Sequence, residues 1–241
     1  MMIIVALFSS LLFAAAAPKT SPTQKADGKL ELIRKIPHSG YSEGIDYYNG
    51  FIWHTLPDAI LKIDPKDGTI LERYKPATDY SESPTWFKGK FYELSFSDNS
   101  ISIGKIVNKK MVFTRAGTTP EIHGWGITHD NKSIIITGDY SPRLYFLNPS
   151  TLKVERTITT PVSALEDLAW DGDGIWASSY TEHRGQVFRI NPKDGSIDQF
   201  FTLSDPEECP VIDGTAWDGK GLWVTGKHCP SIYLFKNPYK K

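Results

Sequence analysis

The chain has 241 residues, of which 40% are apolar, 23% charged and 12% aromatic, with 27 basic and 28 acidic side chains. A net charge of −1 argues against a nucleic-acid-binding protein, which needs a basic surface, and the apolar content argues against intrinsic disorder. Because all-β folds reach about 250 residues as one unit, we expect a single soluble domain with a sizeable core.

The N-terminal segment, residues 1–17, has the character of a secretory signal peptide. Its sequence, MMIIVALFSSLLFAAAA, is apolar, ends in small residues before Pro18 and is too short for a stop-transfer helix. Polar residues 18–28 predict a linker, which leaves residues 29–241 as the folded domain. No later stretch is apolar and long enough to span a bilayer. We therefore expect a secreted or periplasmic monomer that binds neither nucleic acid nor, after signal cleavage, a membrane.

Five segments of the domain share one pattern with a period of about 40 residues. Each contains a short apolar strand, a turn with Gly or Asn, an aromatic or β-branched strand and a third strand. In several copies, an Asn-Pro or Asp-Pro turn then leads to a fourth strand. The copies begin at Glu43, Glu82, Trp125, Glu166 and Asp213. This period is typical of the four-stranded blades of a β-propeller.

The two ends of the chain complement each other. The fifth copy ends at Lys241 without a fourth strand, whereas residues 30–37 (LELIRKIP) match the fourth-strand segments of the other copies. We therefore predict an all-β, five-bladed β-propeller closed by an N-terminal strand in the last blade. Closure matters because an open ring would leave strand edges exposed. The alternative fold is a β-sandwich.

Constant spacing within the copies predicts three sets of equivalent residues. Ten positions after each first residue stand large apolar side chains, which we expect in the core: Trp53, Tyr92, Ile135, Trp176 and Trp223. Fourteen positions after it stand Pro57, Phe96, Asp139, Tyr180 and Lys227. A fixed offset implies one hairpin of fixed length per blade. The first residues and the fourteenth positions should therefore form two rings near one end of the central channel, a common place for ligand sites.

Four of the five first-ring residues are acids, and Trp125 is the fifth. Crowding and burial raise the pKa of carboxyl groups, so one of them can stay protonated and act as a general acid. Lys227 can balance the acids or donate a hydrogen bond to an oxygen that gains charge. Two other interpretations remain open: a buried salt-bridge network, and a structural Ca²⁺ site. Motifs of serine hydrolases, zinc proteases and phosphate-binding loops are absent from the sequence.

The two cysteines lie in segments that flank the fifth copy. They are too few for a disulfide scaffold and lack the spacing of a zinc site. If Asp213 and Lys227 face each other in the fifth hairpin, Cys209 and Cys229 come nearly opposite on the same ladder. An oxidising compartment would let them pair, so we predict a disulfide. The alternative is two free thiols beside the site.

Five motifs follow one another through the copies. They are Tyr41-Ser-Glu-Gly-Ile, Tyr80-Ser-Glu-Ser-Pro-Thr, Gly124-Trp-Gly-Ile-Thr, Arg143-Leu-Tyr-Phe-Leu-Asn-Pro and Trp223-Val-Thr-Gly-Lys. The series resembles the blade motifs of the plant and bacterial glutaminyl-peptide cyclotransferases, which are five-bladed propellers. The resemblance runs in order over residues 30–236. It implies that Glu82 is the catalytic acid, and it places three further family positions on Trp125, Asp139 and Lys227.

Other pocket positions differ from the family pattern. The family has Gln where Glu43 stands and Asn where Glu166 and Asp213 stand, and it has Trp at Phe96 and Tyr180. Amides are replaced by acids and indoles by smaller rings, so the exchanges bear on substrate choice. From the resemblance we expect Glu82 and Lys227 to act in the chemistry. We expect these residues to bind the substrate: Glu43, Phe96, Trp125, Asp139, Glu166, Tyr180 and Asp213.

The resemblance implies an aminoacyltransferase that converts N-terminal glutamine to pyroglutamate with release of ammonia. The α-amine of the substrate attacks its own side-chain amide, so the enzyme mainly fixes the reactive conformer and needs no protein nucleophile or cofactor. The expected partners are peptides or proteins that begin with glutamine. Two alternatives remain open: a non-catalytic propeller that binds a cation or cationic ligand in its acidic channel, and a metal-dependent lactonase-type hydrolase.

Overall fold

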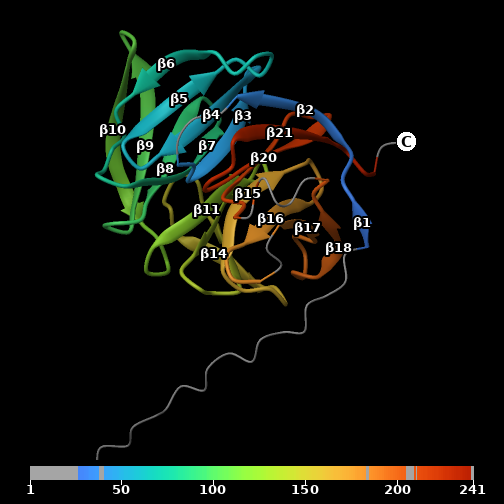
Figure 1. Ribbon diagram of the computed structural model, residues 1–241. Helices are drawn as coiled ribbons and strands as arrows, with labels where there is room; N and C mark the ends of the chain where they lie inside the picture. The colour runs from blue at the N-terminus through green and yellow to red at the C-terminus, as the bar shows by residue number, and fades with distance from the viewer. Residues whose placement is uncertain (1–26, 38–40, 183–184, 205–208, 210, 240–241) are drawn as a thin grey trace, which may run out of the picture.

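The computed structural model describes residues 27–37, 41–182, 185–204, 209 and 211–239. The predicted signal peptide and residues 18–26 of the predicted linker lie outside them. Every regular element of the described residues is a β-strand, and the strands form five sheets arranged around one centre (Figure 1). The predicted all-β, five-bladed propeller is therefore confirmed. Within the described ranges, no helix long and apolar enough to cross a membrane is found.

Each blade is a four-stranded antiparallel sheet, and the first strands of neighbouring blades contact one another around the centre. Blade one contains β3 (Gly44–Tyr48), β4 (Phe51–Leu56), β5 (Ala59–Ile63) and β6 (Ile70–Tyr74). Blade two contains β7 (Ser81–Phe87), β8 (Lys90–Ser95), β9 (Ser100–Val107) and β10 (Lys110–Thr118). Blade three contains β11 (Gly124–His129), β12 (Ile134–Gly138), β13 (Arg143–Leu147) and β14 (Val154–Thr159).

The last two blades use strands from both ends of the chain. Blade four contains β15 (Leu165–Trp170), β16 (Ile175–Ser179), β17 (Gln186–Ile190) and β18 (Ile197–Thr202). Blade five contains β19 (Gly214–Trp217), β20 (Gly221–Thr225) and β21 (Ser231–Lys236), and β2 (Leu32–Pro37) is its fourth strand. Strand β2 pairs antiparallel with β21, which places Ile36 opposite Ile232. The predicted N-terminal closure is thus confirmed.

A further short strand extends blade four. Strand β1 (Gly28–Lys29) pairs in parallel with β18, with Gly28 opposite Phe201, and the Asp27 N–H donates to the Phe200 carbonyl at 2.9 Å. Asp27 and Gly28 belong to the segment expected to be a linker. The chain is therefore already attached to the propeller before β2 begins.

The residues ten positions into each copy lie on the second strands and are buried, as predicted. They are 0–3% exposed: Trp53, Tyr92, Ile135, Trp176 and Trp223. Several of them pack between neighbouring blades. Trp176 of blade four contacts the core of blade five around Leu222, and Trp223 of blade five lies in one cluster with Ile45 of blade one. These side chains therefore hold the blades together.

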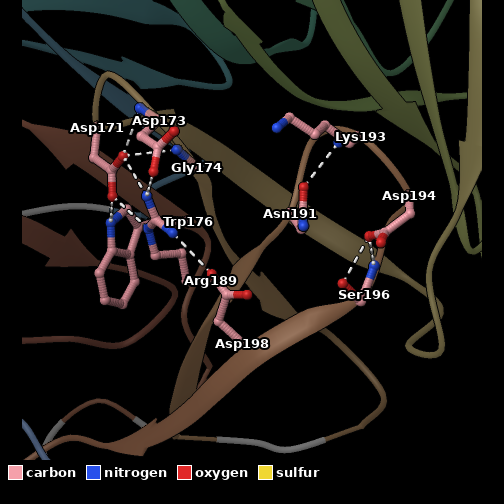
Figure 2. A network of polar contacts seen from close by, with 10 residues as sticks. All are labelled: Asp171, Asp173, Gly174, Trp176, Arg189, Asn191, Lys193, Asp194, Ser196 and Asp198. Atoms are coloured by element: carbon pink, nitrogen blue, oxygen red, sulfur yellow. Dashed lines mark hydrogen bonds and ion pairs between the residues drawn. The ribbon is translucent and has the colours of Figure 1, made fainter.

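Hydrogen bonds fix the turns at the end of blade four opposite to the ring acids (Figure 2). Asp171, in the β15–β16 turn, accepts the Trp176 indole N–H at 2.9 Å and pairs with Arg189 at 2.6 Å. In the Asn-Pro turn before β18, Asn191 Oδ1 accepts the Lys193 N–H, and Asp194 Oδ1 accepts the Ser196 N–H. Short Asn and Asp side chains commonly close turns in this way. These bonds explain why Asn and Asp recur in the turns of the repeat.

Cys209 and Cys229 form a disulfide, as predicted. Both are buried, and they connect the segment before β19 to the segment after β20. Strands β19 and β20 pair with Gly214 opposite Thr225, within one residue of the predicted register. The disulfide therefore ties together the two segments that carry Asp213 and Lys227.

Loss of this disulfide should lower stability. The bond closes a loop with a sequence separation of 20, and removing such a constraint should cost about 3 kcal/mol of unfolding free energy in the chain-entropy model. We expect the C209A/C229A variant to show this loss in urea unfolding. Non-reducing mass spectrometry of the wild type should show the linked peptides. Two alkylatable thiols in the native protein would contradict the assignment.

Candidate active site

A β-bulge at the start of the first strand is repeated around the channel. In blades two, three and four, the register shifts between Ser81 and Pro84, between Gly124 and Ile127, and between Leu165 and Leu168. In each case two residues of the first strand oppose one residue of the second. A bulge re-aims side chains that would otherwise alternate between the two faces. The side chains of two consecutive residues in a first strand can therefore both point towards the channel.

Asp167 shows what the second bulge residue does. Its carboxylate accepts the backbone N–H groups of Ile45 and Thr215 at 3.0 Å each, and it accepts the Ser83 hydroxyl. The Ser83 oxygen in turn accepts the Ile127 N–H at 3.3 Å. These residues come from all five blades. Asp167 is therefore the centre of a hydrogen-bonded hub that joins the blades below the ring of acids.

The first bulge residues face a cavity of about 220 Å³ at one end of the channel. Its lining consists of Tyr41, Tyr80, Glu82, Phe96, Trp125, Tyr140, Glu166, Tyr180 and Lys227. Six of these are residues that the sequence placed in the two rings. The cavity is small and mostly aromatic, with two carboxyl groups and one ammonium group. It has room for a single amino-acid side chain and its α-amino group.

The remaining ring residues do not line this cavity. Glu43 and Asp213 are buried and pair with Lys227, whose Nζ lies 3.2 Å from Glu43 Oε2 and 3.6 Å from Asp213 Oδ2. Asp213 also accepts the backbone N–H of Lys227 at 3.0 Å. Asp139 and Pro57 are half-buried and lie outside the cavity lining. Of the predicted substrate-binding set, some residues thus face the cavity, Glu43 and Asp213 support Lys227, and Asp139 does neither.

Lys227 is held as a cation. Burial alone would lower the pKa of its ammonium group, but the carboxylates of Asp213 and Glu43, followed by Glu166 and Glu82, together raise this pKa above its usual value. The ammonium group also lies over the rings of Tyr41 and Tyr180, 5.4 and 5.7 Å from their centroids. Lys227 therefore carries its positive charge at the cavity wall at any physiological pH.

Glu82, unlike Lys227, has no oppositely charged partner among the described residues. It is 3% exposed, its Oε2 has no hydrogen-bond partner, and among the described residues it forms no ion pair. Burial raises the pKa of its carboxyl group well above the usual value, and the charges of Glu43 and Glu166 raise it further. Glu82 therefore presents a carboxyl group whose protonated form is favoured by burial and by the neighbouring negative charges.

Aromatic contacts shape the rest of the wall. Phe96 stacks on His123 with ring centroids 4.2 Å apart, and the His123 ring is fixed by its contact with the Phe96 carbonyl at 2.7 Å. The Trp125 ring is steeply inclined to the rings of Tyr140 and Tyr180, in T-shaped contacts with centroids 5.1 and 6.2 Å away. These contacts hold the rings in place before any ligand binds.

Three tyrosines of the lining were not expected from the sequence. Tyr41 and Tyr80 each stand two residues before a ring acid, in the repeated Tyr-Ser-Glu motif, and this repetition is a signal that could have identified them. The Tyr80 hydroxyl donates a hydrogen bond to Glu43. Tyr140 follows Asp139 in a loop, and no repeat marks it. Its position depends on the course of that loop.

The arrangement of the ring acids bears on the Ca²⁺ interpretation. In the portion of the chain that the structure covers, no group of three or more His, Cys, Asp or Glu side chains is arranged to hold a metal ion. Two of the acids are instead directed to Lys227. The Ca²⁺ site remains an untested expectation.

The buried carboxyl groups make stability depend on pH. Burial raises the pKa of Asp46 to about 6, of Asp213 to about 7 and of Glu93 to about 8. Between about pH 4 and these values the folded state binds more protons than the unfolded state, so stability falls as pH rises. The slope is about 1.4 kcal/mol per pH unit for each such group. Burial lowers the pKa of His129, so this one group has the opposite effect and contributes stability as the pH rises. We expect the melting temperature to fall from about pH 5 to pH 8, and a rising melting temperature would contradict these shifts.

Comparisons with known proteins agree with this architecture. The family model described as glutamine cyclotransferase matches residues 3–236. Glutaminyl cyclase from Myxococcus xanthus superposes with a TM-score of 0.75 at 16% identity, covering 88% of this chain and 98% of that chain. The PQQ-bound aldose sugar dehydrogenase from Streptomyces coelicolor has a TM-score of 0.55 at 11% identity, covering 88% and 98%. These identities show a shared fold.

No match was found among the curated proteins. The family match spans nearly the whole sequence, and the chain therefore belongs to the glutamine cyclotransferase family.

Proposed function

We propose that this protein is a glutaminyl-peptide cyclotransferase that converts N-terminal glutamine to pyroglutamate and releases ammonia. The observation that carries the proposal is Glu82, a buried carboxyl group without an ion-pair partner among the described residues, at the wall of an aromatic cavity. Had Lys227 paired with Glu82, the acid would have had only a structural role. Lys227 instead pairs with Glu43 and Asp213. The family assignment supports the same reaction.

The chemistry requires little from the protein beyond orientation and proton transfer. The α-amine of the substrate attacks the δ-carbon of its own side-chain amide, a C–N bond forms, and the bond to the amide nitrogen breaks. When the enzyme binds the glutamine residue with its amine close to the side-chain amide, the loss of conformational entropy occurs on binding and no longer adds to the barrier of the reaction. Glu82 donates a proton to the leaving nitrogen and regains one from the attacking nitrogen. Lys227 provides positive potential near the carbonyl oxygen as it gains charge.

The cavity walls suit a glutamine residue. Trp125, Phe96 and Tyr180 provide apolar surface for the methylene groups, and the carboxyl groups of Glu82 and Glu166 can contact the amide and the amine. The volume of about 220 Å³ leaves no space for an extended peptide. We propose that only the first residue enters and that the rest of the peptide or protein lies outside. The reaction as written uses no cofactor, and we expect the enzyme to act as a monomer.

We also propose that the enzyme is secreted or periplasmic. The apolar N-terminal residues support export, and the Cys209–Cys229 disulfide suits an oxidising compartment. Fractionation of cells that express the full chain tests this: the protein should appear outside the cytoplasm, shortened at its N-terminus.

A second candidate is favoured by the number of acids. Four carboxyl groups surround a single lysine, so the site could bind a cationic ligand without turning it over. One assay separates the candidates: ammonia release and mass loss from a glutamine-initiated peptide, with the same peptide acetylated at its N-terminus as the control. Cyclisation of the free peptide alone supports the enzyme. Binding of the free peptide without any ammonia release would support the second candidate instead.

A further inference from the structure

The acids of the first ring divide into two pairs. Glu43 and Asp213, in blades one and five, both contact Lys227. Glu82 and Glu166, in blades two and four, line the cavity on either side of the blade that carries Trp125. Glu82 Oε2 is buried without a hydrogen-bond partner, and among the described residues no salt bridge involves Glu82 or Glu166. Two unpaired carboxyl groups therefore face one small cavity.

Glu166 has no evident role in the fold. It is 4% exposed, and burying a carboxyl group without a partner costs free energy. The neighbouring Asp167 already joins the blades through its hydrogen bonds with Ile45, Ser83 and Thr215. The Glu166 carboxyl group lines the cavity, and a ligand in the cavity could accept or donate the hydrogen bonds that this group does not form with the described residues. Its placement therefore points to a ligand.

The proposed substrate brings a proton that must be removed. The α-amino group of a peptide has a pKa of about 7.7–8.0, so near pH 6 it is almost entirely an ammonium ion. An ammonium nitrogen has no lone pair and cannot attack the amide carbon. Glu82 must be protonated to serve the leaving nitrogen and cannot accept this proton at the same time. A second group in the cavity can.

We propose that Glu166 is a second catalytic residue, which binds the α-ammonium group of the substrate and accepts its proton. This inference rests on the proposed function. The ammonium transfers one proton to the ionised Glu166, and the free amine then forms the C–N bond. Glu82 protonates the leaving nitrogen and recovers a proton from the attacking nitrogen. Glu166 finally returns its proton to the released ammonia, so both carboxyl groups end in their starting forms.

The electrostatics of the site are compatible with this division. The charged groups that face Glu166 come from blades one, two, four and five: Glu43, Glu82, Asp167, Asp213 and Lys227. Burial, and next the charge of Asp213, raises the pKa of Glu166 well above its usual value, as burial and the neighbouring acids do for Glu82. A base is more effective when its pKa approaches that of the group it deprotonates. Two neighbouring carboxyl groups also favour the state in which one holds a proton and the other is ionised.

The test is the pH dependence of kcat/KM for the Glu166→Gln variant. An amide cannot accept the proton, so the variant must use the free amine, and its rate should rise only through the pKa of the substrate amine, near 8. At about pH 6 only about 1–2% of the substrate is free amine, so the variant should be on the order of 10² slower than the wild type. The two rates should converge towards about pH 9, where the amine is neutral without help.

Two further variants complete the experiment. Glu166→Asp keeps a carboxyl group and should keep activity at acidic pH with a lower kcat. Glu93→Gln replaces another buried glutamate of raised pKa, which lies outside the cavity and accepts the Ala77 N–H, and it should leave the pH profile unchanged. Because Glu166 has no partner to lose, the Glu166→Gln protein should melt no lower than the wild type.

The outcomes separate this inference from the function beneath it. A Glu166→Gln rate reduced by the same factor at every pH would overturn the inference, since a positioning role would act equally on both forms of the substrate. A rate higher than the wild type at every pH would also overturn it. No ammonia from the wild-type enzyme at any pH would instead show that the proposed function fails.

Discussion

The Glu82→Gln variant will release ammonia from a glutamine-initiated peptide about 10²–10⁴ times more slowly than the wild type, with a smaller change in KM. Glutamine preserves the shape of the side chain and its capacity for hydrogen bonds, but it cannot donate a carboxyl proton to the leaving nitrogen. Because burial raises the pKa of the Glu82 carboxyl group, the protonated form that donates is favoured in the wild type. Steady-state kinetics with an ammonia-coupled assay measures the effect.

The matched control for Glu82 lies on the next strand of the same blade. Glu93 is also a buried glutamate, on β8, and its carboxylate accepts the Ala77 N–H instead of facing the cavity. Glu93→Gln should therefore leave kcat within a few-fold of the wild type. Full turnover by Glu82→Gln would mean that another residue supplies the proton, whatever the fold contributes.

The Asp167→Ala variant should be the most destabilised single-residue variant of the channel. It leaves three backbone N–H groups, those of Ile45, Leu168 and Thr215, buried without an acceptor. Each orphaned group costs about 1–3 kcal/mol, so the loss should be at least about 3 kcal/mol and could exceed the stability of the domain. Urea unfolding, or solubility at 37 °C where the protein no longer folds, measures this.

A conservative substitution distinguishes the effect of losing the hydrogen bonds of Asp167 from the effect of losing its carboxyl group. Asp167→Asn keeps one acceptor oxygen but points an amide nitrogen at backbone N–H donors, so it should also destabilise, although less than alanine. Ser83→Ala removes the hydroxyl that donates to Asp167 and accepts the Ile127 N–H, so it leaves one backbone N–H without an acceptor instead of three and serves as the milder comparison. Equal stability of Asp167→Ala and the wild type would show that the hub does not hold the blades together.

Much of the fold was predictable because each blade repeats the same hairpin. The constant offset from Glu82 to Tyr92 and Phe96 required a hairpin of fixed length, and the missing last strand required one from the other end of the chain. The register of blade five followed from the same offset, which is why the Cys209–Cys229 disulfide could be predicted. These are properties of local pairing, and local pairing leaves a periodic trace in the sequence.

The site was predictable only in part, because periodicity does not report bulges or loop paths. A bulge brings both Glu166 and Asp167 to the channel, whereas the spacing alone identified the first of them. Asp139 falls on an equivalent position but lies outside the cavity lining, while its neighbour Tyr140 enters it. The choice of partner for Lys227 between several nearby acids also depends on side-chain geometry that spacing cannot convey.

The pairing of β2 with β21 has a consequence for how the protein folds. Residues that face each other across this pair, such as Ile36 and Ile232, are separated by most of the chain, and contacts of such long sequence separation form slowly. Strand β2 is synthesised long before β21, so blade five is complete only after most of the domain has been made. Until then β21 exposes an unpaired edge, on which a second unfinished chain can pair. Refolding should accordingly end in a slow phase, and its yield should fall as the protein concentration rises.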